Sequence, residues 1–173
     1  MQDNFTRADS TASIGSATPT GIWFSPSDAA TLGISTGRGT AISGTGRALI
    51  DTGISDKCAI QGQLTTLANA RMSLAFRSHS VNPQWLEVAN VGISYVLSKF
   101  KDAIESRLVT YSTTPVSGDT IRVELNGPQI SVYLNGAIII QREESTYEGS
   151  ASHGFRVSST EQRFDDFKFE VRL

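Results

Sequence analysis

Two Asn-Gly pairs in the stretch IRVELNGPQISVYLNGAIII, residues 121–140, constrain the fold more than any other feature of the sequence. Apolar and polar residues alternate around both pairs, which is the two-residue period of a half-buried strand. Asn135-Gly136 tolerates the positive φ angles that a two-residue type I′ hairpin turn requires. Residues 126–129 indicate a looser reversal, because Pro128 cannot donate a hydrogen bond to a strand ladder. The stretch therefore predicts an antiparallel meander.

The alternation also predicts which side chains of this meander face the core, because a register slip of one residue would invert both faces. The side chains expected to point inward are Val123, Leu125, Ile130, Val132 and Leu134. Those expected to point outward are Arg122, Glu124, Ser131 and Tyr133.

Similar short alternating runs fill the chain from about residue 47 onward. The further runs that we expect to be strands are RALIDTGI, CAIQGQLTT, ARMSLAFRS, QWLEVANV, ISYVLSKF, SRLVTYSTT, HGFRVSS and DFKFEVRL. Turn signals recur between them at about 8–12 residues, a spacing typical of a sandwich or barrel. Residues 97–108 could also form a helical face, but the turn-like Lys101-Asp102-Ala103 favours a hairpin.

The first 46 residues are rich in Gly, Ser and Thr and predict loops and irregular edge strands. The run SPSDAATLG could form one helical turn after Ser25, with Pro26 at its first position. Trp23, in the apolar run GIWF, is expected in the core. We therefore expect short helical turns at most.

Composition narrows the class of protein. At 173 residues the chain is expected to form a single domain, residues 1–173. Its net charge of −2 and its scattered Lys and Arg argue against a nucleic-acid binder, which needs a basic face. No apolar run approaches the ~20 residues of a membrane span. The lone Cys58 allows no internal disulfide and is expected to be buried.

Several motifs in order resemble one superfamily. DNFTRADS followed by GIW is similar to the first strand of concanavalin-A-like jelly rolls of the laminin-G and pentraxin type. LAFRSHSVNPQW and YVLSKF resemble the central run of those proteins, and GDTIRVELNGPQISVYLNG resembles their hairpin pair. GFRV and RFDDFKFEV resemble their closing strand, so the likeness covers nearly the whole chain and is weakest over residues 8–45.

This resemblance implies an all-β sandwich of two curved antiparallel sheets. It also implies a function among those of the superfamily: lectins, carbohydrate-binding modules, glycosidases, lyases, and phage tail or baseplate proteins. The Ser/Thr/Gly-rich loops, the absence of a signal peptide and the lack of disulfides favour the phage context. We therefore expect the protein in a virion tail or outside the cell.

Catalytic signatures of the superfamily are missing. The glucanase pattern Glu-x-Asp-x-x-Glu does not occur, and Glu143-Glu144 are adjacent, so in a strand they point to opposite faces. His79 and His153 are the only histidines, and both are expected to be exposed in loops. No Gly-x-Ser-x-Gly elbow occurs. We expect a protein that is not an enzyme.

Calcium is the one ion that the sequence could accommodate. Asp165 and Asp166 lie between Phe164 and Phe167, whose spacing breaks strict alternation and predicts a bulge. A carboxylate there could join a calcium site, or it could accept hydrogen bonds from the backbone of the bulge. We expect no other cofactor.

A saccharide site is predicted around Trp85. If Leu86 and Val88 face the core, Trp85 and Glu87 face outward, where an exposed indole ring could stack on a sugar. The alternative is that Trp85 packs under a covering loop. Neighbouring candidates for hydroxyl or ring contacts are Arg77, His79, Asn82, Tyr111 and Tyr133.

The sequence thus predicts a non-catalytic carbohydrate-binding module for a bacterial cell-surface polysaccharide, carried by a phage tail or baseplate and acting in several copies. Tail proteins of the virion would be its protein partners. The alternatives are a structural or oligomerising virion module without a glycan site, and a glycosidase or polysaccharide lyase on the same fold.

Overall fold

A computed structural model describes residues 1–10, 13, 15–17, 21–26, 31–66, 71–79 and 81–172. The strands are, in chain order, β1 (Gln2–Asp3), β2 (Ser16–Ala17), β3 (Gly21–Ile22), β4 (Thr31–Ser35), β5 (Arg38–Ser43), β6 (Gly46–Asp51), β7 (Cys58–Thr66), β8 (Met72–Ser78), β9 (Trp85–Val91), β10 (Ser94–Lys101), β11 (Ile104–Ser112), β12 (Asp119–Asn126), β13 (Gln129–Leu134), β14 (Ala137–Glu143), β15 (Ser152–Val157) and β16 (Arg163–Val171). Over the described ranges, no helix is long and apolar enough to cross a membrane. The helical turn expected after Ser25 falls largely on residues 27–30, outside the described residues.

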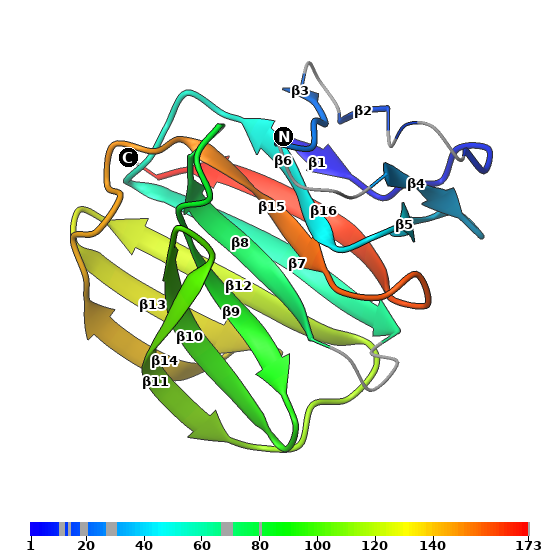
Figure 1. Cartoon of the computed structure of the whole chain (residues 1–173). Coiled ribbons are helices and arrows are strands. Elements are labelled where there is room, and N and C mark those ends of the chain that lie inside the picture. The colour runs from blue at the N-terminus through cyan, green and yellow to red at the C-terminus, as the bar shows by residue number, and fades with distance from the viewer. Residues whose placement is uncertain are drawn as a thin grey trace.

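The strands form two large sheets that stack face to face (Figure 1). The six-stranded sheet has the order β11-β10-β9-β8-β15-β6. The eight-stranded sheet has the order β14-β13-β12-β7-β16-β5-β4, with β1 also paired to β16. Strands β2 and β3 form a small separate pair. All of these pairings are antiparallel, so the predicted all-β sandwich is confirmed.

The turns of the sheets follow local chemistry. Asn135 and Gly136 have φ angles of 50° and 84°, which confirms the predicted two-residue turn between β13 and β14. Asp102 and Ala103 also have positive φ angles, 52° and 62°, and they connect β10 to β11 as the predicted hairpin rather than as a helix. The turn from β12 to β13 is tighter than expected, because Asn126 pairs directly with Gln129.

The core lies between the two sheets. All five side chains expected to point inward from β12 and β13 pack there, four of them fully buried and Leu134 partly. Trp23 is also in this core, as predicted, among the rings of Phe155, Phe164 and Phe167. Burying one such side chain is worth about 1.5–3 kcal/mol, so the aromatic centre is a large part of the stabilisation.

Cys58 is fully buried in this core, as expected. Burial raises the pKa of its thiol to about 11, so the thiol stays protonated near neutral pH. Its role is packing rather than reactivity.

Candidate functional site

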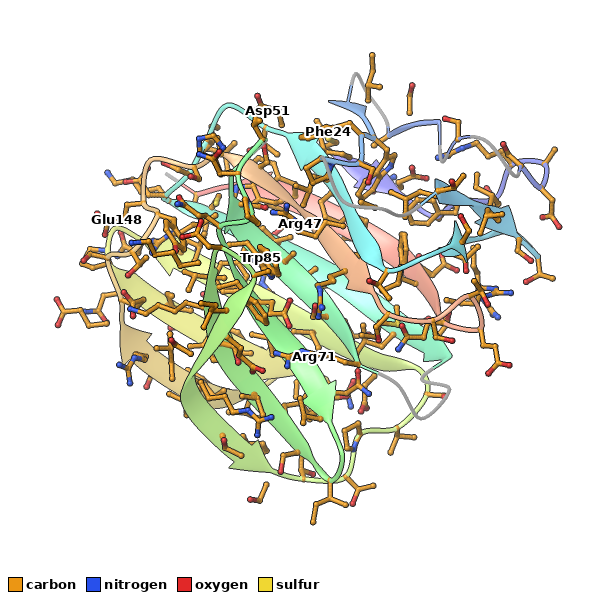
Figure 2. The ribbon with its side chains drawn as sticks, in the orientation of Figure 1. Phe24, Arg47, Asp51, Arg71, Trp85 and Glu148 are labelled. Atoms are coloured by element: carbon orange, nitrogen blue, oxygen red, sulfur yellow. The ribbon has the colours of Figure 1, made fainter. Side chains whose placement is uncertain are left out.

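The outer face of the six-stranded sheet carries Trp85 and Glu87, because Leu86 and Val88 pack in the core between the sheets. This confirms the predicted direction of all four side chains. Trp85 and Phe100 are cross-strand partners on β9 and β10, and together with Leu49 and Ala75 they form a second apolar cluster separate from the core. This outer face, with Trp85, Arg47 and Arg71 upon it, is turned toward the viewer in Figure 2.

The indole ring of Trp85 is covered rather than free, however. Its ring stacks on that of Phe100 with centroids 4.3 Å apart and planes 4° from parallel. The guanidinium of Arg47, which reaches across from β6, lies 4.3 Å from the Trp85 ring. Trp85 is therefore only 5% exposed, and the expectation of an open sugar-stacking ring is wrong.

Small residues make this stack feasible. Arg47 and Trp85 belong to strands β6 and β9, which are separated by β15 and β8. Gly154 and Ala75, direct partners on these middle strands, lie level with Leu49 and Glu87, between the levels of Arg47 and Trp85. Long side chains from either edge can therefore extend across the middle of the sheet.

A group of charged and hydroxyl side chains surrounds the stacked rings. We name it the arginine–glutamate cluster: Arg71, Glu87, Ser98, Glu105 and Arg156. The Arg71 Nε donates to Glu87 Oε1 at 2.6 Å, and its Nη1 and Nη2 donate to the two oxygens of Glu105 at 2.9 and 3.0 Å. The Trp85 Nε1 donates to Glu87 Oε2 at 2.7 Å, so the carboxylate also holds the indole in place.

The pairing shifts the pKa values of the two groups that reach the surface. Burial opposes ionisation of Glu105, but hydrogen bonds from Arg71 and Ser98 outweigh it and hold the Glu105 pKa below its usual value. Burial acts against the charge of Arg71 as well, and its bonds and attraction to Glu105 and Glu87 raise its pKa overall. Both groups are therefore charged at neutral pH.

Arg156 stands apart within the cluster. Its Nη1 lies 3.7 Å from Glu87 Oε1, which is beyond hydrogen-bond distance, and this buried nitrogen has no hydrogen-bond partner. Ser73, the cross-strand partner of Arg156, is fully buried, and its Oγ also lacks a partner. Buried polar atoms without partners are uncommon, and they often mark a place where water or a ligand binds.

Other residues predicted for the site lie elsewhere. Arg77 is fully buried at the end of β8, with a φ of 46° and a register irregularity between β8 and β15 beside it. Its Nη1 donates to the carbonyl oxygen of Glu144 at 2.7 Å and its Nη2 to that of Gly127, both in turns of the eight-stranded sheet. Burial lowers its pKa. The expectation that Arg77 contacts a sugar is corrected: it joins the two sheets.

The loop after β8 is organised locally. His79 is half-buried, and its Nδ1 accepts hydrogen bonds from the backbone N–H groups of Val81 and Asn82 at 3.1 Å each. Asn82 is exposed. Both residues lie at one end of the six-stranded sheet, and His79 is engaged in shaping its own loop.

The two tyrosines are not neighbours of Trp85. Tyr111 pairs across the sheet with Tyr95, which points into the core, so Tyr111 faces the same side at the exposed edge of the sandwich. Tyr133 points outward as expected, but from the eight-stranded sheet, where its hydroxyl donates to Glu124 at 3.1 Å. The expected grouping with Trp85 is therefore wrong for both.

The carboxylates proposed for calcium lie in the predicted bulge of β16. Asp166 has a φ of 48°, and its backbone N–H donates to Asp165 Oδ1 at 2.8 Å, which is the backbone role that the sequence offered as an alternative. Burial raises the pKa of Asp165. Across the part of the chain that the structure describes, no group of three or more His, Cys, Asp or Glu could hold a metal ion.

His153 is the clearest error of the sequence-based expectations. It is fully buried in β15 rather than exposed in a loop, its ring stacks on Phe169, and its Nε2 lies 2.8 Å from the carbonyl oxygen of Ile54. Burial lowers its pKa to about 4, so the ring is neutral at physiological pH.

Arg47, Arg71, Ser98, Phe100, Glu105 and Arg156 were missed as site residues. A signal existed for two of them. Arg156 lies between the apolar Phe155 and Val157. Ser98 follows the apolar Leu97 in a run expected to be a strand. Alternation alone places Arg156 and Ser98 on the outward face.

Comparison with known proteins places the fold. No family model matches the sequence, and no curated protein matches it. A carbohydrate-binding module CBM66 from Bacillus subtilis superposes with a TM-score of 0.73 at 17% identity, over 86% of this chain and 94% of that one. A Bacillus subtilis protein of unknown function with a galectin-like fold has a TM-score of 0.63 at 12% identity, over 87% and 90%. The galectin LEC-6 of Caenorhabditis elegans has a TM-score of 0.56 at 16% identity, over 72% and 90%. The chain therefore has the jelly-roll fold of carbohydrate-binding modules and galectins.

Proposed function

We propose that the protein is a non-catalytic carbohydrate-binding module whose ligand contacts the arginine–glutamate cluster on the outer face of the six-stranded sheet. The observation that carries the proposal is the set of paired arginines and carboxylates beside stacked aromatic rings, with two buried polar atoms left unpartnered. Guanidinium groups donate to sugar hydroxyls and carboxylates accept from them, so neighbouring groups of both kinds suit vicinal diols.

The shared fold supports this assignment. The most similar structures named above include a carbohydrate-binding module and a galectin. The pairing of Glu87 and Glu105 with Arg71 favours binding over hydrolysis, because a glycosidase requires a carboxyl group with a raised pKa to act as its acid. The pKa of Glu105 is instead lowered.

We propose a bacterial cell-surface polysaccharide as the ligand and a phage tail or baseplate as the assembly that carries the module. The support is the resemblance of several sequence motifs to a superfamily that includes phage tail and baseplate proteins, together with the Ser/Thr/Gly-rich first 46 residues. Weak single sites of this kind gain strength when several copies bind one surface.

A matched pair of variants tests the site. Glu105→Gln removes a carboxylate oxygen that can accept sugar hydroxyls, and we expect affinity for a retained polysaccharide to fall at least about tenfold, since one charge-assisted hydrogen bond contributes about 1.5–3 kcal/mol. Glu124→Gln changes a similarly paired carboxylate on the eight-stranded sheet and should leave affinity unchanged. The measurement is affinity electrophoresis and calorimetry on a panel of bacterial wall polysaccharides, with melting temperatures as the control for folding.

A second candidate, an oligomerising module without a glycan site, is favoured by large exposed aliphatic side chains. Ile93 is 74% exposed, Ile104 71% and Val116 59%. Light scattering on the same samples distinguishes the two functions. A stable oligomer that retains no polysaccharide would support this candidate and contradict the carbohydrate site.

A further inference from the structure

We infer that the saccharide bound by this face carries an anionic group, and that Arg156 and Ser73 receive it. This inference rests on the proposed function and narrows it to acidic saccharides. It starts from the hydrogen-bonding capacity that the cluster leaves unused.

Both carboxylates of the cluster are already engaged. Glu87 accepts from Arg71 with one oxygen and from Trp85 with the other, at 2.6 and 2.7 Å. Glu105 accepts from Arg71 with both oxygens and from Ser98 at 2.7 Å. Arg71 is likewise used at its Nε, Nη1 and Nη2. The carboxylate nearest to Arg156, that of Glu87, is therefore already engaged with other donors.

Arg156 is ion-paired with Glu87 at 3.7 Å but forms no hydrogen bond with it. Its guanidinium lies 5.5 Å from the centre of the Phe100 ring and 5.8 Å from that of Trp85. The nearest carboxylate oxygen, Glu87 Oε1, is 3.7 Å from its Nη1, and this nitrogen donates no hydrogen bond. The Arg156 side chain is 22% exposed, so part of it reaches the surface although its Nη1 is buried.

Ser73 provides a second donor next to Arg156. The two residues are direct partners on β8 and β15, and Ser73 points to the outer face because Met72 and Leu74 on either side of it pack in the core. Its Oγ is fully buried and has no hydrogen-bond partner. We therefore assign the accessible contact to Arg156 and a supporting one to Ser73.

Buried donors without acceptors on two cross-strand partners, Arg156 and Ser73, match a group that presents two acceptor oxygens. Carboxylate, phosphate and sulfate groups do so, and a guanidinium binds them more strongly than it binds a neutral hydroxyl. A neutral sugar would add no negative charge beside Arg156 and Arg47, which are cross-strand partners, whereas an acidic one would. The geometry therefore favours a uronic acid or another acidic sugar over a neutral one.

The test compares acidic saccharides with their neutral forms. The probes are polygalacturonate and alginate before and after chemical reduction of their carboxyl groups, and a polysaccharide bearing phosphomonoester groups before and after phosphatase treatment. We expect at least about tenfold tighter binding to an acidic form than to its neutral counterpart, with affinity falling as salt rises. Loss on carboxyl reduction identifies a carboxylate, and loss on dephosphorylation identifies a phosphate.

Variants assign the effect to residues. Arg156→Gln should remove the preference for the acidic form, Ser73→Ala should weaken it several-fold, and Arg122→Gln on the eight-stranded sheet should leave it intact. Equal binding of acidic and neutral forms, or a preference that survives Arg156→Gln in a folded protein, overturns this inference while the proposed function stands. Failure to bind any saccharide, acidic or neutral, overturns the proposed function as well.

Discussion

The outer faces of the two sheets use the same residue types in different ways. On the eight-stranded sheet Arg122 donates to Glu124 at 3.1 Å and to Glu170 at 2.8 Å, and Arg172 donates to Glu124 as well. All of these side chains reach solvent, that of Glu170 at 52% exposure and those of Arg122 and Glu124 at 26% and 16%. On the six-stranded sheet, by contrast, Glu87 is fully buried beside stacked rings.

The ion pairs on the eight-stranded sheet form a solvated network, whereas those on the six-stranded sheet surround a buried carboxylate. Exposed ion pairs contribute little to stability and their members satisfy one another. A buried carboxylate is costly unless it is held by several donors, and the six-stranded sheet supplies three elements to hold Glu87: β9 itself, β15 and the residue before β8. Among the residues that the structure describes, this second face carries two buried polar atoms without hydrogen-bond partners, Ser73 Oγ and Arg156 Nη1.

The largest difference between the faces is expected from their aromatic residues. Trp85→Ala removes a ring packed against Phe100 and Arg47, so it should lower the free energy of unfolding by about 3–5 kcal/mol. Tyr133→Ala, on the other face, should lower it by less than about 1 kcal/mol. Urea titration of both variants measures this, and equal losses would remove the distinction between the faces.

The next difference concerns the buried carboxylate. Glu87→Ala leaves Arg71 and Arg156 without their shared partner and Trp85 Nε1 without an acceptor, so a loss of about 3 kcal/mol is expected. Glu124→Ala removes a partly buried partner of two arginines that reach solvent, and it should cost less than about 1 kcal/mol. If Glu124→Ala proved as costly as Glu87→Ala, both faces would have to be regarded as structural networks.

The smallest expected effect is the pH dependence of stability, in which the buried His153 differs from the carboxylates on the two outer faces. His153 has a pKa lowered to about 4 by burial, so between its unfolded value near 6.5 and about 4 the unfolded chain binds more protons and stability falls with falling pH. The loss from pH 7 to pH 5 should be on the order of 2 kcal/mol. Glu105 and Glu124, one on each face, have lowered pKa values and lose their contributions only at lower pH.

Unfolding measured across this pH range in wild type and in His153→Asn tests this origin. The variant loses packing at every pH, so the informative quantity is the slope of stability against pH, which should become flatter above pH 5. A slope that is the same in both proteins would assign the acid sensitivity to other groups.

Alternation of side chains was enough to predict the strands from β6 onward and the two-sheet fold. It worked because each strand buries one face, and the expected directions of Leu86, Val88 and the meander were confirmed. The eight- and six-stranded orders were not predictable in this way. They depend on pairings between distant segments such as β7 with β16.

Errors in the site arose where local alternation stops. At Arg77 a positive φ turns the side chain inward, toward carbonyl groups of the eight-stranded sheet, and period-two counting does not detect such a bulge. His153 was misassigned because Gly154 was taken for a turn residue. In the strand, a Cβ at this position would lie 1.9 Å from the carbonyl oxygen of Ala48, so only glycine fits there.

The direction of Trp85 was predictable, but its burial was not. The side chain that covers it, Arg47, belongs to a strand three positions away in the sheet and 38 residues earlier in the sequence. Similarly, Tyr111 was misplaced because its face follows from its pairing with Tyr95 across the sheet. Contacts between such distant segments decide which outward residues become a site.

Arg77, on β8 beside β9, joins this strand to the opposite sheet by donating to the carbonyl oxygens of Gly127 and Glu144. These hydrogen bonds of Arg77 lie apart from the residues that would contact a ligand. Laboratory evolution could therefore replace Ser73, Glu105 and Arg156 to obtain new specificities, while the contacts of Arg77 continue to hold the two sheets in place.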